Sequence, residues 1–177
     1  MRKKHVRNLT AGCAAFMAAA FVFSAGFSKT AFADEADKTT LVYGSTDYTR
    51  INPAMDEHCE INVLLFDGLT DHDGDNQIIP RLAKSWEYDE ENLTYTFHLE
   101  EGVKWHDGEP FTAEDVKFTF EAIMDPANES ENAPDYEDIE SIEVIDEHTV
   151  TFHLSNVNTA FLEYMTKPVM PKHLLEG

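Results

Sequence analysis

The chain has 177 residues and is strongly acidic, with 34 Asp and Glu residues against 13 Lys and Arg residues and a net charge of −21. A surface of this charge repels phosphate backbones and anionic lipid headgroups, so we expect no nucleic-acid binding and no binding to a membrane surface. The length is enough for one domain with a real hydrophobic core.

The first 33 residues have the pattern of a secretory signal peptide. Basic residues at positions 2, 3, 4 and 7 precede an apolar run at 14–23, and the triplet Ala31-Phe32-Ala33 follows. The apolar run is shorter than the roughly 20 residues of a membrane-spanning helix. We therefore expect cleavage after Ala33 and an exported protein, located in the periplasm, outside the cell or at the cell surface.

A lipid anchor at Cys13 is a weaker alternative, because the apolar run follows this cysteine instead of preceding it. After cleavage we expect a flexible tail at residues 34–39 and a domain at residues 40–177. That part keeps 8 of the 13 basic residues and all 34 acidic residues, so its net charge is 8 − 34, or −26. It also keeps one cysteine, Cys59, so no intramolecular disulfide can form.

Residues 40–86 predict short elements separated by turns. In order they are a buried strand at 40–45, a loop at 46–53, a short amphipathic helix at 60–66, a hairpin at 70–80 with its turn at Asp73-Gly74, and a short helix or turn at 81–86.

The hairpin turn at Asp73-Gly74 lies in an acidic run that resembles a calcium loop. Such a loop needs a glycine at its sixth position and a glutamate at its twelfth, where this chain has Asn76 and Leu82. We therefore favour a turn and keep a calcium-binding extracellular module as a lesser alternative. The histidines are scattered, and no spacing predicts a zinc site.

Residues 93–116 join a strand, a turn and a helix in one run. Apolar residues at every second position from 93 to 99 predict a strand with one buried face. Asp107-Gly108 predicts a turn, and Thr112 followed by Asp115 predicts the capped start of a helix. This helix has a core-facing stripe and ends at residues 125–126; the stripe consists of Val116, Phe120 and Ile123.

The remaining elements alternate between loops and short regular segments. They are a polar, mobile excursion at 127–136, a hairpin of strands 139–145 and 149–154, and a short helix at 160–165.

Three ordered motifs resemble the family 5 solute-binding proteins, the extracytoplasmic receptors of peptide and nickel ABC importers. They are Asn52-Pro53 with the segment 65–69, the segment 82–87, and the run 93–116. The resemblance implies an α+β (α/β) fold of the periplasmic-binding-protein-like type II, with a mixed sheet, hairpins and short helices. Members of the family are far longer, so we expect residues 40–177 to be the N-terminal portion of one lobe, truncated and without the second lobe.

The same resemblance implies a substrate-binding component of an ABC importer, which captures oligopeptides, nickel or a related solute for delivery to a permease. In the family the end of the first strand and the following loop line the cleft, which implies ligand binding by Ser45, Thr46, Asp47 and Tyr48. The implied partners are permease and ATPase subunits, with membrane association only through the permease. We expect a monomer and no cofactor.

A purely structural role for residues 45–48 and a fragment without binding activity remain as alternatives. The polar groups at 45–48 also suit a turn whose backbone they satisfy. Half a cleft buries little of any ligand, so a truncated, secreted fragment that binds nothing is the alternative function.

Enzymatic chemistry is not expected. His58 and Cys59 are adjacent, which points their side chains in different directions, and no nucleophile elbow or phosphate loop is present. Trp86, Trp105 and Phe111 are interpreted as core residues, and His106-Asp107-Gly108 as a turn.

Overall fold

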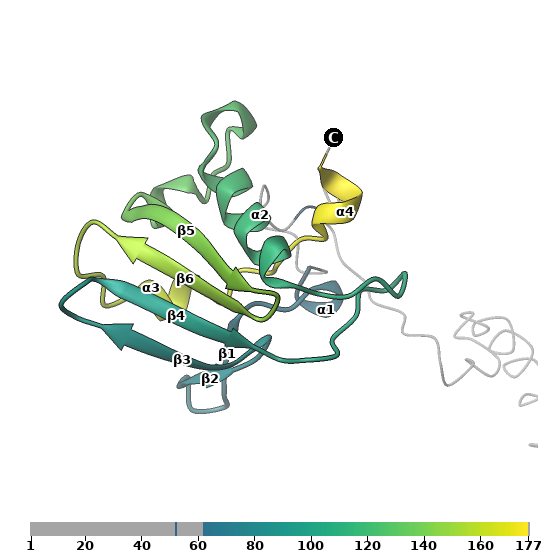
Figure 1. Cartoon of the computed structure of the whole chain (residues 1–177), viewed down its shortest axis with the longest axis horizontal. Coiled ribbons are helices and arrows are strands. Elements are labelled where there is room, and N and C mark those ends of the chain that lie inside the picture. The colour runs from purple at the N-terminus through teal and green to yellow at the C-terminus, as the bar shows by residue number, and fades with distance from the viewer. Residues whose placement is uncertain (1–51, 53–61, 177) are drawn as a thin grey trace, which may run out of the picture. The chain divides into compact units, whose positions relative to one another are not determined.

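The computed structural model describes Asn52 and residues 62–176, which are drawn in colour in Figure 1. Every element below lies in the unit Gly44–Gly177. The signal peptide, the predicted strand at 40–45 and, apart from Asn52, the predicted loop at 46–53 lie outside the described residues.

Short helices and two antiparallel sheets make up the described chain. The elements are α1 (Asn62–Leu65), β1 (Thr70–His72), β2 (Ile78–Pro80), β3 (Ala83–Asp89), β4 (Thr94–Leu99), α2 (Ala113–Met124), η1 (Pro126–Asn128), η2 (Ala133–Tyr136), β5 (Ile139–Asp146), β6 (Thr149–Leu154), α3 (Phe161–Tyr164) and α4 (Lys172–Leu175). Strands β1 and β2 form one sheet, and the other has the order β3-β4-β6-β5. We expected a mixed sheet, whereas every strand pair that the structure describes is antiparallel.

The hairpin of β3 and β4 corrects one prediction. A helix or turn at 81–86 was wrong, because β3 begins at Ala83 and pairs with β4, placing Trp86 opposite Phe97 and Tyr88 opposite Tyr95. The polar turn between the strands is held by the Asp89 carboxylate, which accepts the backbone N–H groups of residues 91 and 92 at 2.9 and 3.1 Å. Pairing across the sheet therefore decides the conformation of β3.

The hydrophobic core lies on one face of the four-stranded sheet, where α2 and α3 pack (Figure 1). Tyr95, Phe97 and Phe152 supply the sheet side. Phe120 of α2 meets Phe152 edge to face at 5.2 Å, and Phe161 of α3 lies 4.7 Å from Tyr95. Such aromatic contacts between centroids add to the burial of apolar area. The predicted hairpin of β5 and β6 and the predicted helix α3 are confirmed.

Helix α2 begins and ends where the sequence predicts. The Asp115 carboxylate reaches back to accept the backbone N–H of Thr112 at 2.9 Å and its hydroxyl at 3.3 Å, which satisfies a free donor at the helix start. Val116, Phe120 and Ile123 are all fully buried. The helix ends at Met124, immediately before Asp125-Pro126.

The polar segment after α2 is anchored, which differs from the mobile excursion expected at 127–136. It contains the two 3₁₀ helices η1 and η2, and it buries Asn132 and Tyr136. The Tyr136 hydroxyl donates a hydrogen bond to the carbonyl of Tyr164 at 2.8 Å. Tyr136 and Asn132 thus attach the segment to the rest of the fold.

Candidate functional site

The ligand-binding residues predicted from the sequence, Ser45, Thr46, Asp47 and Tyr48, lie outside the described residues. Cys59 lies outside them as well. The geometry below therefore comes from the part of the chain after residue 61.

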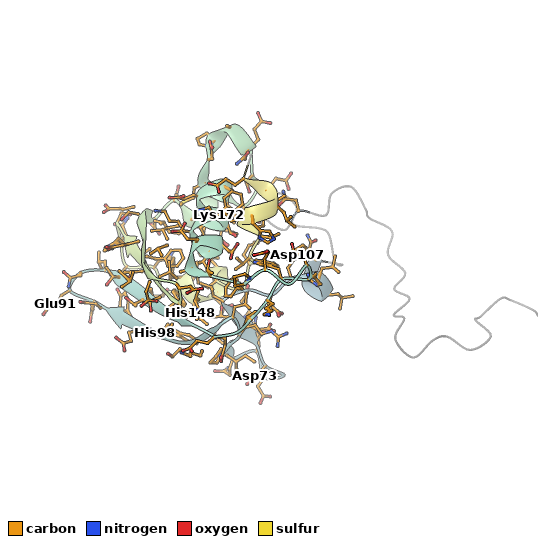
Figure 2. All side chains as sticks on the ribbon, turned by 45° about the vertical axis from the view of Figure 1, so that its right-hand side comes forward. Asp73, Glu91, His98, Asp107, His148 and Lys172 are labelled. Carbon is orange, nitrogen blue, oxygen red and sulfur yellow. The ribbon has the colours of Figure 1, made fainter. Side chains whose placement is uncertain are left out.

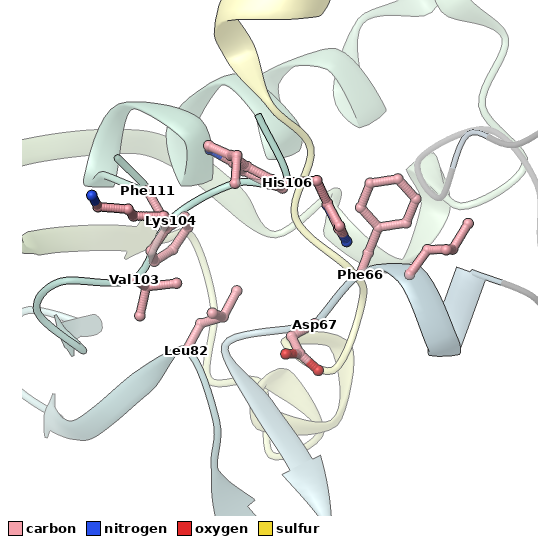
Figure 3. A pocket seen from close by; sticks show the side chains of 9 residues that line it. Phe66, Asp67, Leu82, Val103, Lys104, His106 and Phe111 are labelled. Atoms are coloured by element: carbon pink, nitrogen blue, oxygen red, sulfur yellow. The ribbon is translucent and has the colours of Figure 1, made fainter. Parts of the chain in front are cut away.

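A cavity of about 90 Å³ lies among α1, the residue before β3 and the turn at residues 103–111 (Figure 3). Its volume is roughly that of three water molecules or a small side chain. Most of its wall is apolar, and the lining residues are Leu65, Phe66, Asp67, Leu82, Val103, Lys104, Trp105, His106 and Phe111.

The turn at 103–111 is a tight backbone structure that places Trp105 and Phe111 beside the cavity. Backbone hydrogen bonds join Trp105 to Glu109 at 2.8 Å and Phe111 to Val103 at 3.0 Å. Gly108 has a φ of +97°, a conformation that suits glycine, and the Asp107 carboxylate accepts the N–H of Glu109 at 3.1 Å. The turn predicted at Asp107-Gly108 is confirmed.

Trp105 carries a buried hydrogen-bond donor. Its indole packs edge to face on Phe111 at 6.0 Å between ring centroids, and its Nε1 atom is buried, with no acceptor among the described residues. A buried donor without a partner costs about 1–3 kcal/mol.

The predicted core role holds for Phe111, which is 2% exposed, whereas Trp86 and Trp105 are partly buried against the core. Sequence reasoning placed all three in the core and missed the donor at Trp105. A tryptophan in the sequence does not show whether its indole N–H has a partner, because that depends on where other segments of the chain lie.

Charged groups surround the cavity. Asp67 is committed to Arg81, whose Nε atom donates to its Oδ1 atom at 2.9 Å, and this hydrogen bond raises the pKa of Arg81. Lys104 and His106 are exposed beside the apolar wall (Figure 3). The cavity thus combines a largely apolar wall with polar residues at its edge.

Metal binding finds no support in the described residues. No group of three or more His, Cys, Asp or Glu side chains among them is placed to hold a metal ion. The calcium-like run forms a turn, in which the Asp73 carboxylate accepts the backbone N–H groups of Asp75 and Gln77, both at 2.9 Å. The Oδ1 atom of Asp73 therefore holds the turn together by accepting backbone N–H groups.

A second depression, open and polar, has a volume of about 410 Å³ and is lined by Lys84, His98, Glu101, Asp146, Glu147, His148 and Thr149. Its two histidines are labelled in Figure 2. Lys84 donates to Glu101 at 3.2 Å, and the Asp146 carboxylate accepts the backbone N–H of His148 at 2.8 Å, so both groups have partners within the protein.

Residues 77–173, more than half of the chain, match the family described as bacterial extracellular solute-binding proteins, family 5 Middle. The chain belongs to this family. Among the helices in the described residues, none has the length and apolar character needed to cross a membrane.

Similar proteins include a putative ABC transporter peptide-binding protein of Brucella ovis, 43% identical over 99 residues, which are 55% of this chain and 19% of the relative. Di/tripeptide-binding protein 1 of Pseudomonas aeruginosa is 37% identical over 122 residues, covering 59% of this chain and 23% of the relative. The chain thus spans about a fifth to a quarter of the length of these relatives.

Two solved structures share the fold. NikZ of Campylobacter jejuni, in complex with Ni(L-His), is 41% identical with a TM-score of 0.72, over 75% of this chain and 27% of that chain. OppA of Haemophilus influenzae, in complex with the peptide RPPGFSPFR, is 28% identical with a TM-score of 0.65, over 71% of this chain and 29% of that chain. These likenesses confirm the expected periplasmic-binding-protein-like type II fold for the part that is shared.

Proposed function

We propose that this chain contributes part of one lobe to the substrate-binding component of an ABC importer that captures peptides outside the membrane. The observation that carries the proposal is the match of residues 77–173 to the solute-binding family. The peptide-binding names of the Brucella ovis and Pseudomonas aeruginosa relatives support peptide as the ligand class.

The proposed role is binding without catalysis. In a two-lobe receptor, a ligand that binds the closed state more tightly than the open state shifts the population toward closure. The permease then recognises the closed receptor, and ATP is consumed by other subunits. Export after cleavage at Ala33, a tail at 34–39, a binding domain at 40–177 and a monomeric state complete this proposal.

The ligand contacts that we propose are Ser45, Thr46, Asp47 and Tyr48. Hydroxyl groups suit a peptide backbone, a carboxylate suits an amine, and an aromatic ring supplies an apolar wall. The cavity beside Trp105 adds a place for one small apolar group. At about 90 Å³ it is far smaller than the pockets that enclose whole ligands, so tight binding of a peptide needs further surface.

A nickel–histidine chelate is the second candidate ligand. It is favoured by NikZ, which shares 41% identity with this chain and was solved with Ni(L-His). The two ligand classes differ in charge and size, so one titration series separates them.

Isothermal titration calorimetry of the full chain with di- to pentapeptides and with Ni(L-His) tests the proposal. We expect heat from peptides and none from the chelate, and Asp47→Asn should weaken peptide binding about tenfold through loss of a hydrogen bond from the ligand to a charged acceptor. Glu90→Gln removes the same charge from an exposed turn and should leave the affinity unchanged. Equal affinities of the two variants would contradict the role of Asp47, and heat from the chelate alone would reverse the choice of ligand.

Export is tested separately by mass spectrometry of the secreted protein. An N-terminus at Asp34 supports cleavage after Ala33. A lipidated Cys13 would contradict it.

A further inference from the structure

Helix α4 is held on the body by polar contacts of its first two residues. The backbone N–H of Lys172 donates to Asp115 Oδ1 at 2.9 Å, and the Nζ atom of Lys172 donates to Glu114 Oε2 at 2.9 Å. The His173 Nε2 atom lies 2.7 Å from Asp107 Oδ2, in the turn that also carries Trp105. Figure 2 shows Asp107 and Lys172 at the same end of the described body.

Apolar packing contributes little to α4 and much to the residues before it. No residue of α4 is buried, and Leu174 and Leu175 are 65% and 48% exposed. In contrast, Val169 and Met170 are buried, and the N–H of Met170 donates to the Thr119 hydroxyl at 2.8 Å. Pro171 therefore stands between a segment anchored in the core and a segment held by charges.

The surroundings of His173 are mostly anionic. The titratable and charged groups that face it are Asp107 and Glu109 from the turn, Glu114 and Asp115 from α2, Lys172 from its own helix and Glu176 directly after that helix. The hydrogen bond with Asp107 raises the pKa of His173 above its ordinary value of 6.5 and lowers the pKa of Asp107 below 3.8.

The directions of these two pKa shifts decide in which pH range the His173–Asp107 pair stabilises the folded protein. The raised pKa of His173 means that its contribution is present below pH 6.5 and is lost as the pH rises through the pKa in the folded protein. The lowered pKa of Asp107 means that its contribution is lost only in strong acid, below 3.8. The ion pair is therefore complete between these limits.

We propose that His173 and Asp107 form a pH-operated latch, which holds α4 against the turn at 103–111 in mild acid and loosens it above neutral pH. A neutral imidazole still donates a hydrogen bond but no longer carries charge, so the release is partial. The latch is independent of the proposed transport role.

Trp105 reports on the latch, because its ring centroid lies 6.5 Å from that of His173 and a protonated imidazole quenches indole fluorescence. The chain has two tryptophans, so Trp86→Phe leaves Trp105 as the single reporter and preserves an aromatic contact with Phe97. We expect its emission to rise between pH 6 and 9 with a midpoint above 6.5. His173→Gln should abolish this transition, and Asp107→Asn should move its midpoint to lower pH.

Hydrogen exchange tests the movement itself. We expect the protection factor of the Lys172 amide, corrected for intrinsic exchange, to fall about twofold to fivefold across the same transition, as for exposed ion pairs. The buried amide of Met170 should keep its protection, which places the opening after Pro171.

His153 provides the matched control. It pairs with Glu143 at 3.5 Å and is 38% exposed, similar to the 31% of His173, but it lies on the sheet. His153→Gln should leave the Trp105 transition unchanged. A transition that survives His173→Gln, or constant protection of Lys172 across it, would overturn the latch.

Discussion

Thr119 and Met170 join helix α2 to the segment that precedes α4. The Thr119 hydroxyl accepts the backbone N–H of Met170 at 2.8 Å and donates to the carbonyl of Asp115 at 2.7 Å, and both residues are buried. One hydroxyl thus satisfies a buried donor that lies 51 positions away in the sequence. The Thr119 hydroxyl thus uses both its acceptor and its donor at this contact.

Replacing Thr119 by valine should destabilise the protein. The methyl groups of valine fill the same volume, but the Met170 N–H loses its acceptor inside the core, which costs about 1–3 kcal/mol. Thr119→Ser keeps the hydroxyl and loses one methyl group, about 1 kcal/mol. Urea unfolding followed by circular dichroism measures both variants. A valine variant as stable as the original protein would show that the hydrogen bond contributes nothing.

Gly68 is required by a close approach of two backbones. A Cβ atom built at this position would lie 2.5 Å from the carbonyl oxygen of Thr166 and 2.8 Å from that of Met165. Because backbone atoms cannot move aside as the end of a flexible side chain can, Gly68→Ala should lower the free energy of unfolding by about 1–3 kcal/mol. Gly74 has open space around its Cβ position, and Gly74→Ala should be neutral or stabilising by less than about 1 kcal/mol. Thermal unfolding of the pair is the measurement, and similar midpoints for both variants would contradict the packing argument.

The close approach of Gly68 to residues 165–166 also explains part of the family motif at 65–69. The Leu69 N–H donates to the Met165 carbonyl at 2.9 Å, so the motif seats α3 against the start of β1. The sequence identified the motif, but only the fold shows that its glycine is needed for packing between segments far apart in the chain.

Much of the fold was predictable because its signals are local. The alternation at 93–99, the cap at Thr112 and the turn at Asp107-Gly108 each depend on neighbouring residues. Strand β3 was missed because its conformation depends on pairing with β4, and the order β3-β4-β6-β5 depends on contacts that no window of sequence contains.

The candidate site was less predictable for the same reason. Residues 45–48 came from the resemblance alone and stay a prediction. The pairing of Asp107 with His173 spans 66 positions, so no local pattern predicts it. The unpaired indole N–H of Trp105 is a property of the assembled fold, which a residue type does not reveal.

Tyr136 should make the protein sensitive to alkali. It is 1% exposed, and burial raises its pKa far above the ordinary value of 10. The unfolded chain therefore ionises this tyrosine first, so stability is complete below pH 10 and falls above it by up to about 1.4 kcal/mol per pH unit. Urea unfolding at pH 9, 10 and 11 measures this slope.

Tyr136→Phe separates this group from the other tyrosines. The variant loses the hydrogen bond to the Tyr164 carbonyl, about 1 kcal/mol at neutral pH, and should show a shallower loss of stability above pH 10. Tyr88→Phe, at a residue that is 39% exposed, should keep the slope of the original protein. An unchanged slope in Tyr136→Phe would exclude Tyr136 as its source.

Asp115 connects the start of α2 to the start of α4, and its replacement should affect both. One carboxylate oxygen accepts the N–H of Thr112 at 2.9 Å, the other accepts the N–H of Lys172 at 2.9 Å, and the residue is 4% exposed. In Asp115→Asn one of these acceptors becomes an amide donor that faces an N–H group, so we expect a loss of about 1–3 kcal/mol in the free energy of unfolding.

Glu114→Gln is the control for Asp115→Asn. Glu114 is the neighbour of Asp115, and its carboxylate makes an exposed ion pair with Lys172 that the substitution removes. Its loss should stay below about 0.5 kcal/mol, as is usual for exposed ion pairs. Hydrogen exchange should show faster exchange at the Lys172 amide in Asp115→Asn and little change in Glu114→Gln. Equal stability and equal exchange in the two variants would show that surface charge, and not the buried pair of acceptors, connects these helices.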